Sequence, residues 1–143
     1  TLLSGGFNNF AGFNAGGKVQ KPNKKYNSVK QKEYFSNVKA QAWWLVADRL
    51  RNTHDYLING NTNYDSDELI SIDSGIPGLE SLISELTTPR RDFDKAGRVK
   101  VESKDDLKKR DIMSPNKADS FIMALSTSLV NDNRVSDLTV SGF

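Results

Sequence analysis

One aspartate, Asp119, lies beside the apolar stripe of a predicted helix in the stretch DIMSPNKADSFIMAL, residues 111–125. Ser114 suits the N-cap of this helix, and Pro115 suits its first position. A carboxylate at this place is either an ordinary solvated acid of the helix or a group that holds a ligand. The spacing alone favours the solvated acid.

A second candidate feature is an excess of basic side chains in the first part of the chain. Residues 1–60 carry nine Lys and Arg against three Asp and Glu, whereas residues 61–143 carry eleven against fifteen. Clustered ammonium groups can neutralise the phosphates of a nucleic acid. Charge alone, however, favours a solvated loop. The basic strip comprises Lys18, Lys21, Lys24, Lys25, Lys30 and Lys32.

A third feature is a strand followed by a short basic helix. Residues 98–102 alternate polar and apolar side chains, which predicts a strand. Ser103 can cap a helix whose first turn is acidic and whose last turn, residues 108–110, is basic. Charges in this order stabilise any helix, so they require no function by themselves.

The longest predicted helix spans residues 31–57, where apolar side chains recur at intervals of three and four. Trp43 and Trp44 point about 100° apart around it. We expect one in the core and the other over a neighbouring element, because duplex DNA offers no free bases for stacking. Lys39 and Arg49 lie toward the polar side, where they could face a phosphate backbone.

Shorter elements complete the expected fold. Asn59 and Gly60 end the long helix. The short β-branched stretch 68–72 is expected to form an irregular turn or edge strand. The spacing of apolar residues over 79–86 predicts a short amphipathic helix. Residues 94–97 form a turn before the predicted strand.

Composition restricts the class of protein. A chain of 143 residues with 36% apolar and 27% charged residues fits a single globular domain. It has no apolar run long enough for a membrane span and no signal-peptide pattern. The absence of cysteine excludes a disulfide scaffold and cysteine metal sites. One histidine, His54, leaves little room for a histidine-rich zinc site or a serine triad, and the phosphate-loop spacing is absent.

The ordered motifs resemble the nuclease domain of bacteriophage terminase large subunits, the DNA-packaging motors of tailed phages. In that family a strand ends in a Ser-Lys or similar pair, and a short basic helix follows. Ser-Pro-Asp and Ala-Asp-Ala then precede an apolar helix. The stretch YFSNVKAQAWWLVADRL resembles a second family feature, an Asn followed by Lys/Arg-Ala and an aromatic pair. The resemblance covers most of residues 34–125, and the residues that match the first set are Ser103, Lys104, Arg110, Ser114, Pro115, Ala118 and Asp119.

The resemblance implies an α/β fold of the RNase-H-like type, with a mixed sheet flanked by helices. It also implies a metal-dependent endonuclease that cuts concatemeric double-stranded DNA during genome packaging in the host bacterial cytoplasm. In such sites carboxylates hold two Mg²⁺ or Mn²⁺ ions, and the family's last metal-binding carboxylate falls at Asp119. The implied partners are duplex DNA, the portal protein and the small terminase subunit. The residues expected to contact DNA are Lys21, Lys24, Lys25, Lys104, Lys108, Lys109 and Arg110.

The sequence also departs from the family pattern. The family's other two metal-binding aspartates and its ATPase domain lie upstream of the matching region. We therefore expect residues 1–143 to be most of a nuclease domain, with a sheet incomplete at its N-terminal side and two metal carboxylates missing. Asn116 and Ser120 stand where the family usually has Asp and Ala. The alternatives are a non-catalytic DNA- or portal-docking module, such as a prophage remnant, and an unrelated α/β domain.

Overall fold

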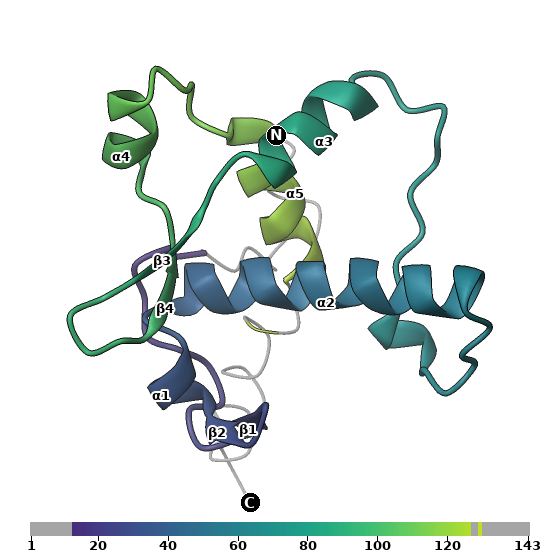
Figure 1. Ribbon diagram of the computed structural model, residues 1–143, viewed down its shortest axis with the longest axis horizontal. Coiled ribbons are helices and arrows are strands. Elements are labelled where there is room, and N and C mark those ends of the chain that lie inside the picture. Colours follow the sequence, from purple (N-terminus) through teal and green to yellow (C-terminus); the bar gives the residue numbers. More distant parts are fainter. Residues whose placement is uncertain (1–12, 127–128, 130–143) are drawn as a thin grey trace, which may run out of the picture.

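One long helix, α2, organises the chain in a computed structural model that describes residues 13–126 and 129 (Figure 1). The β3–β4 hairpin and α4 lie on one side of the view, and α3 and α5 lie above α2. In chain order the elements are β1 (Lys25–Tyr26), β2 (Val29–Lys30), α1 (Gln31–Tyr34), α2 (Val38–Ile58), the 3₁₀ helix η1 (Ser66–Glu68), α3 (Leu79–Thr87), β3 (Arg91–Phe93), β4 (Val99–Val101), α4 (Lys104–Lys109) and α5 (Asn116–Leu125).

The predicted helix over residues 31–57 is interrupted near its beginning. Helix α1 ends at Tyr34, and α2 begins only at Val38. Between them, Phe35 forms a parallel bridge with Val99 of β4. The Asn37 side chain then caps α2 by accepting from the backbone N–H of Ala40 at 2.9 Å. A strand-like contact with β4 therefore replaces helix at these positions, and the expectation of one continuous helix is wrong.

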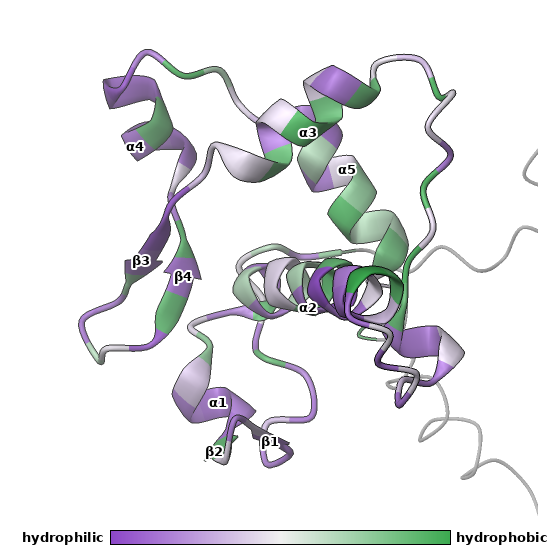
Figure 2. Cartoon of the chain, turned by 45° about the vertical axis from the view of Figure 1, so that its right-hand side comes forward, coloured by the Kyte–Doolittle hydropathy of each residue, from purple (hydrophilic) through white to green (hydrophobic). Residues whose placement is uncertain are grey.

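The core lies where α2 crosses α5. Figure 2 shows the mostly apolar α5 in green and the mostly hydrophilic α4 in purple. Trp43 is buried in this core, whereas the ring of Trp44 meets that of Phe35 edge-on, with centroids 6.3 Å apart. The expected division between the two tryptophans is confirmed. The core cluster consists of Ala42, Trp43, Val46, Ala118 and Ile122.

The strands form two small antiparallel sheets in the described part of the chain. Strand β1 pairs with β2, and β3 pairs with β4. The expected strand at residues 98–102 is confirmed as β4, while β3 was not expected. Within residues 13–126 and 129, the one parallel pairing is the bridge between Phe35 and Val99. The α/β character is confirmed, but the described residues do not make up a complete mixed sheet.

The turn that joins β3 to β4 is closed by the side chain of one aspartate. Asp94 Oδ1 accepts from the backbone N–H groups of Ala96 and Arg98, each at 2.9 Å. Gly97 has φ of 76°, a left-handed conformation that glycine adopts without steric cost. This turn directs Val99 into the core.

Among the helices of the described residues, none is long and apolar enough to cross a membrane.

Candidate functional site

The Asp119 carboxylate lies between two lysines that come from other elements. Lys39 is in the first turn of α2, and its Nζ is 3.4 Å from Asp119 Oδ1. Lys104 is the first residue of α4, and its Nζ is 3.6 Å from Asp119 Oδ2. Asp119 itself is in the first turn of α5. The carboxylate therefore lies beside Lys104, in the segment that leaves β4.

The burial of these three side chains differs. The side chains of Asp119 and Lys39 are each 19% exposed, whereas that of Lys104 is 57% exposed. Both separations exceed the usual length of an N–H···O hydrogen bond, so the contacts are charge pairs. Asp119 and both lysines line an open hollow of about 290 Å³ whose wall includes Trp43. A ligand could therefore reach the carboxylate from solvent.

The start of α5 corrects one expectation. Helix α5 begins at Asn116, and Pro115 rather than Ser114 is at its N-cap. The Ser114 hydroxyl donates to Asn116 Oδ1 at 3.0 Å and makes no cap hydrogen bond to the helix backbone. The predicted capping role of Ser114 is therefore wrong, and so is the first helical position of Pro115.

A glutamate from α3 takes over the capping of α5. Glu85 Oε2 accepts from the backbone N–H groups of Lys117 at 2.7 Å and Ala118 at 3.0 Å. These are among the donors that a helix leaves without intrahelical partners at its N-terminus. A tertiary contact between α3 and α5 thus fixes the turn that carries Asp119.

The described residues do not fit a complete metal site. A divalent cation of the magnesium or calcium type takes several oxygen ligands. No group of three His, Cys, Asp or Glu side chains in residues 13–126 and 129 is placed to hold a metal ion. The two ammonium groups beside Asp119 also oppose a cation at that place. Asp119 alone cannot form such a site.

Basic residues in and after α4 are divided between ion pairs and solvent. The Arg110 guanidinium donates to the carboxylate of Glu102, a residue only 7% exposed, and this bond lowers the pKa of Glu102. Lys109 Nζ lies 2.8 Å from Asp106 Oδ1. Lys108 is exposed. Contact of these residues and Lys104 with DNA stays a prediction.

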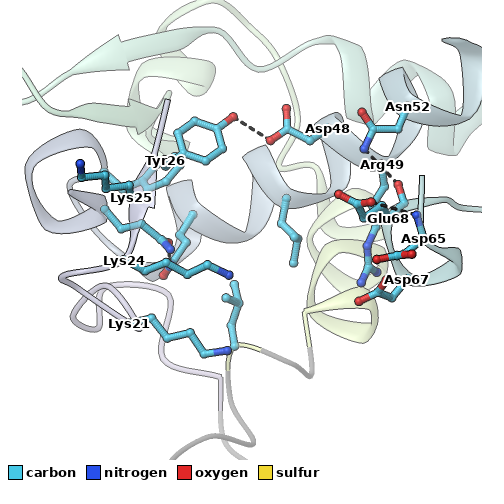
Figure 3. Close-up of a pocket in the computed structure, with 15 residues that line it drawn as sticks. Lys21, Lys24, Lys25, Tyr26, Asp48, Arg49, Asn52, Asp65, Asp67 and Glu68 are labelled. Carbon is cyan, nitrogen blue, oxygen red and sulfur yellow. Dashed lines mark hydrogen bonds between the residues drawn. The ribbon is translucent and has the colours of Figure 1, made fainter. Parts of the chain in front are cut away.

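The N-terminal lysines line one side of an open basin of about 710 Å³ beside α2. Figure 3 shows three lysines on one side of this basin and three acids on the other. A phosphate backbone would be attracted by the first wall and repelled by the second. The basic wall consists of Lys21, Lys24 and Lys25, and the acidic wall of Asp65, Asp67 and Glu68.

Two polar contacts hold the basic wall against α2. The Tyr26 hydroxyl donates to Asp48 Oδ2 at 2.7 Å; burial and this hydrogen bond raise the pKa of the Tyr26 phenol well above its usual range. The Gln41 side chain exchanges two hydrogen bonds of 2.8 Å with the backbone of Gln20. The segment that carries the lysines is thus tied to the long helix at two points.

Sequence reasoning missed Glu85 and the acidic wall. Glu85 gave no local signal, because its partners are 32 and 33 residues away in the chain. The acidic wall had a signal, since three acids stand within the four residues 65–68. Its position opposite the lysines depends on how η1 folds back on α2, which charge counting does not reveal.

Comparison with solved structures identifies a similar fold. The chain matches the nuclease domain of the large terminase subunit gp2 of bacterial virus Sf6 with a TM-score of 0.70 and 30% sequence identity. The match covers 77% of this chain and 50% of that one. The chain resembles a phage terminase nuclease domain. It spans about half the length of the solved domains that it matches.

Variants of the Sf6 domain with a lysine-to-alanine change match similarly. One, solved with manganese and beta-thujaplicinol, has a TM-score of 0.72 and 30% identity over 79% of this chain and 51% of that one. Another, solved with calcium, has a TM-score of 0.68 and 29% identity over 77% and 50%. No protein-family model matches the sequence, and no curated protein matches it. Among these comparisons, the similarity to terminase nuclease domains therefore comes from the solved structures.

Proposed function

We propose that this chain is part of a terminase nuclease domain that cuts concatemeric double-stranded DNA during phage genome packaging. The supporting observation is the placement of Asp119 within a terminase-like fold. The carboxylate is held in the first turn of α5, next to the segment that leaves β4. It faces a hollow open to solvent rather than the core.

We infer that the complete nuclease uses a divalent cation, Mg²⁺ or Mn²⁺, and that Asp119 is one of its ligands. Similar domains have been solved with manganese and with calcium. Oxygen ligands suit these ions. The further carboxylates would have to come from outside the described residues, because those residues hold no acidic cluster around Asp119.

Duplex DNA is the proposed substrate, and two groups of basic residues are its proposed contacts. The first is the basic wall of the basin, and the second is Lys104 with residues 108–110. A packaging enzyme must accept any sequence, and phosphate contacts carry no sequence information. Partial neutralisation of the second group by Glu102 and Asp106 weakens its attraction for phosphate.

The resemblance also suggests the setting in which the chain works. We propose the host bacterial cytoplasm as its location, and the portal protein and the small terminase subunit as its partners. The docking-module hypothesis stays a prediction, because no contact in the described residues favours it over a nuclease.

The proposed function is tested by supplying the other half of the domain. Residues 13–126 replace the matching half of the Sf6 nuclease domain, and the hybrid is incubated with supercoiled plasmid and Mn²⁺. We expect cleavage that is lost in the Asp119→Ala variant, while Asp73→Ala, which changes an exposed loop acid, retains it. A folded hybrid that cuts equally well with Asp119→Ala would contradict the proposal.

A further inference from the structure

Two ammonium groups share one carboxylate in the lining of the hollow. Lys39 Nζ and Lys104 Nζ each lie beside a different oxygen of Asp119, at 3.4 and 3.6 Å. An ammonium group has three N–H donors, and neither lysine uses a short hydrogen bond in this contact. The cluster therefore carries a net charge of +1 and keeps N–H donors available to an incoming anion.

Lys39 is the better fixed of the two lysines. Its side chain is 19% exposed, and it projects from the first turn of α2, whose start is capped by Asn37. It lines the hollow together with Lys104, Asn116 and Ser120. The hollow therefore offers two cationic groups and two polar side chains, with one carboxylate between the cations.

The Asp119 carboxylate opposes anion binding at this place. A unit negative charge about 4 Å from a phosphate costs about 1 kcal/mol in water, and more where solvent is partly excluded. The same carboxylate attracts both lysines and so reduces their attraction for other anions. Neutralising Asp119 removes both effects at once.

We propose that Lys39 and Lys104 form a phosphate-binding pair for duplex DNA, and that the charge of Asp119 masks this pair in the chain as it stands. The inference rests on the proposed action on DNA and adds Lys39 to its contacts. It also assigns Asp119 a second role, as a suppressor of DNA affinity, which is independent of cleavage.

The first test measures DNA affinity of residues 1–143 without metal. Fluorescence anisotropy with a labelled duplex of about 20 base pairs is recorded in EDTA over a range of salt concentrations. Asp119→Asn is expected to bind about fivefold more tightly than the parent. Its log–log salt dependence should steepen by about 0.9 for each additional phosphate that the variant neutralises. Asp73→Asn is the matched control: it makes the same charge change in an exposed loop, and its Oδ1 can still accept from Gly75.

The second test asks whether the gain in affinity passes through Lys39. In the Lys39→Ala background, Asp119→Asn is expected to give a clearly smaller gain, because one of the two unmasked cations is absent. Lys95 is an exposed lysine of the β3–β4 turn. In the Lys95→Ala background, Asp119→Asn should therefore give the full gain in DNA affinity. Lys39→Arg retains the gain, and Lys39→Gln, which keeps part of the aliphatic stem, behaves like Lys39→Ala if the fold is intact by circular dichroism.

The outcomes separate this inference from the proposed function. A parent chain that binds duplex, with no gain in Asp119→Asn beyond that in Asp73→Asn, overturns the masking inference alone. A gain that is unchanged in Lys39→Ala overturns the role of Lys39. Absence of duplex binding by the parent and by Asp119→Asn at low salt overturns both the inference and the proposed action on DNA.

Discussion

At the scale of single residues, Glu102 illustrates how the site region is held together. It follows β4 and is only 7% exposed. Its carboxylate accepts from the Arg110 guanidinium and, at 3.0 Å, from the backbone N–H of Arg90. Removing one partner of such a pair leaves the other charge without compensation. Glu102 therefore joins the start of the hairpin to the end of α4, close to Lys104.

Protonation of Glu102 at acid pH should lower the free energy of unfolding. The Arg110 hydrogen bond lowers the pKa of the carboxyl below its ordinary value of 4.5 in the folded chain. A carboxyl with a lowered folded-state pKa contributes its full stability above pH 4.5 and loses it as the pH falls through the folded-state pKa. Urea-unfolding midpoints from about pH 6 to about pH 3 should therefore fall less steeply in Glu102→Gln than in the parent.

The matched control for this experiment is Glu80→Gln, because Glu80 is an exposed glutamate of α3. It should follow the parent at every pH. Identical pH profiles for Glu102→Gln and Glu80→Gln would show that the Arg110 contact does not contribute to stability.

At the scale of secondary structure, α2 carries the core on one face and the site on its first turn. Trp43 is 9% exposed and packs in the cluster shared with α5. Leu57, near the end of the same helix, is 69% exposed. Substitutions at these two residues therefore distinguish the effect of core packing on the unfolding free energy from that of helix propensity.

Trp43→Ala should damage the fold rather than DNA contacts. Truncating a buried aromatic side chain removes its transfer free energy and leaves a cavity, and the usual loss is about 3–5 kcal/mol of unfolding free energy. Leu57→Ala should change the unfolding free energy by no more than about 0.5 kcal/mol. Both values come from urea titrations followed by circular dichroism. Equal, small losses would place Trp43 outside the core.

Local sequence patterns predicted those elements whose signals lie within a few residues. The amphipathic pattern predicted α3, the polar and apolar alternation predicted β4, and Ser103 does cap α4 by accepting from the backbone N–H of Asp106. The break before α2 was not predictable, because it depends on Phe35 pairing with β4, which lies 64 residues further along the chain.

The same distinction applies to the candidate site. The family resemblance singled out Asp119, whereas the spacing of the residues alone favoured a solvated acid. Sequence spacing could not show that Lys39 lies beside Asp119, since this proximity depends on the packing of α2 against α5 and β4. Capping by Glu85 depends on the packing of α3 against α5 in the same way.

At the scale of the whole molecule, the basic and acidic parts of the chain face each other across one basin. The basic wall comes from the positively charged first part of the chain, and the acidic wall comes from the negatively charged remainder. Opposite walls reduce the field that a distant polyanion experiences. Duplex binding through this surface should consequently be weak and sensitive to salt.

Replacing Lys21, Lys24 and Lys25 together with alanine should weaken duplex binding to a similar extent on all sequences. The log–log salt dependence should flatten by about 0.9 for each phosphate that the variant no longer neutralises. The corresponding triple Lys→Arg variant keeps the charges and should bind like the parent. Anisotropy titrations on two unrelated duplexes measure both quantities. If the triple-alanine variant binds like the parent at low salt, the lysines form only a solvated loop.

Residues 1–143 alone should show weak or no nuclease activity. The residues that the structure describes hold no group of three side chains able to bind a metal ion, and Mg²⁺ needs several oxygen ligands to offset its dehydration. Two lysines also lie beside Asp119. Plasmid incubated with the pure chain and Mn²⁺ should remain largely supercoiled. Robust cleavage that disappears in Asp119→Ala would mean that the chain completes the site by itself.

We propose that Asp119 is a metal-binding carboxylate of a terminase-type nuclease. Its most direct test is an electron paramagnetic resonance titration of Mn²⁺ into the hybrid domain described above, with and without Asp119→Asn. Losing one charged oxygen ligand should weaken Mn²⁺ binding by about tenfold or more, while the control Asp73→Asn leaves the affinity unchanged. Equal Mn²⁺ affinity in the parent hybrid and in Asp119→Asn would show that Asp119 is not a metal ligand.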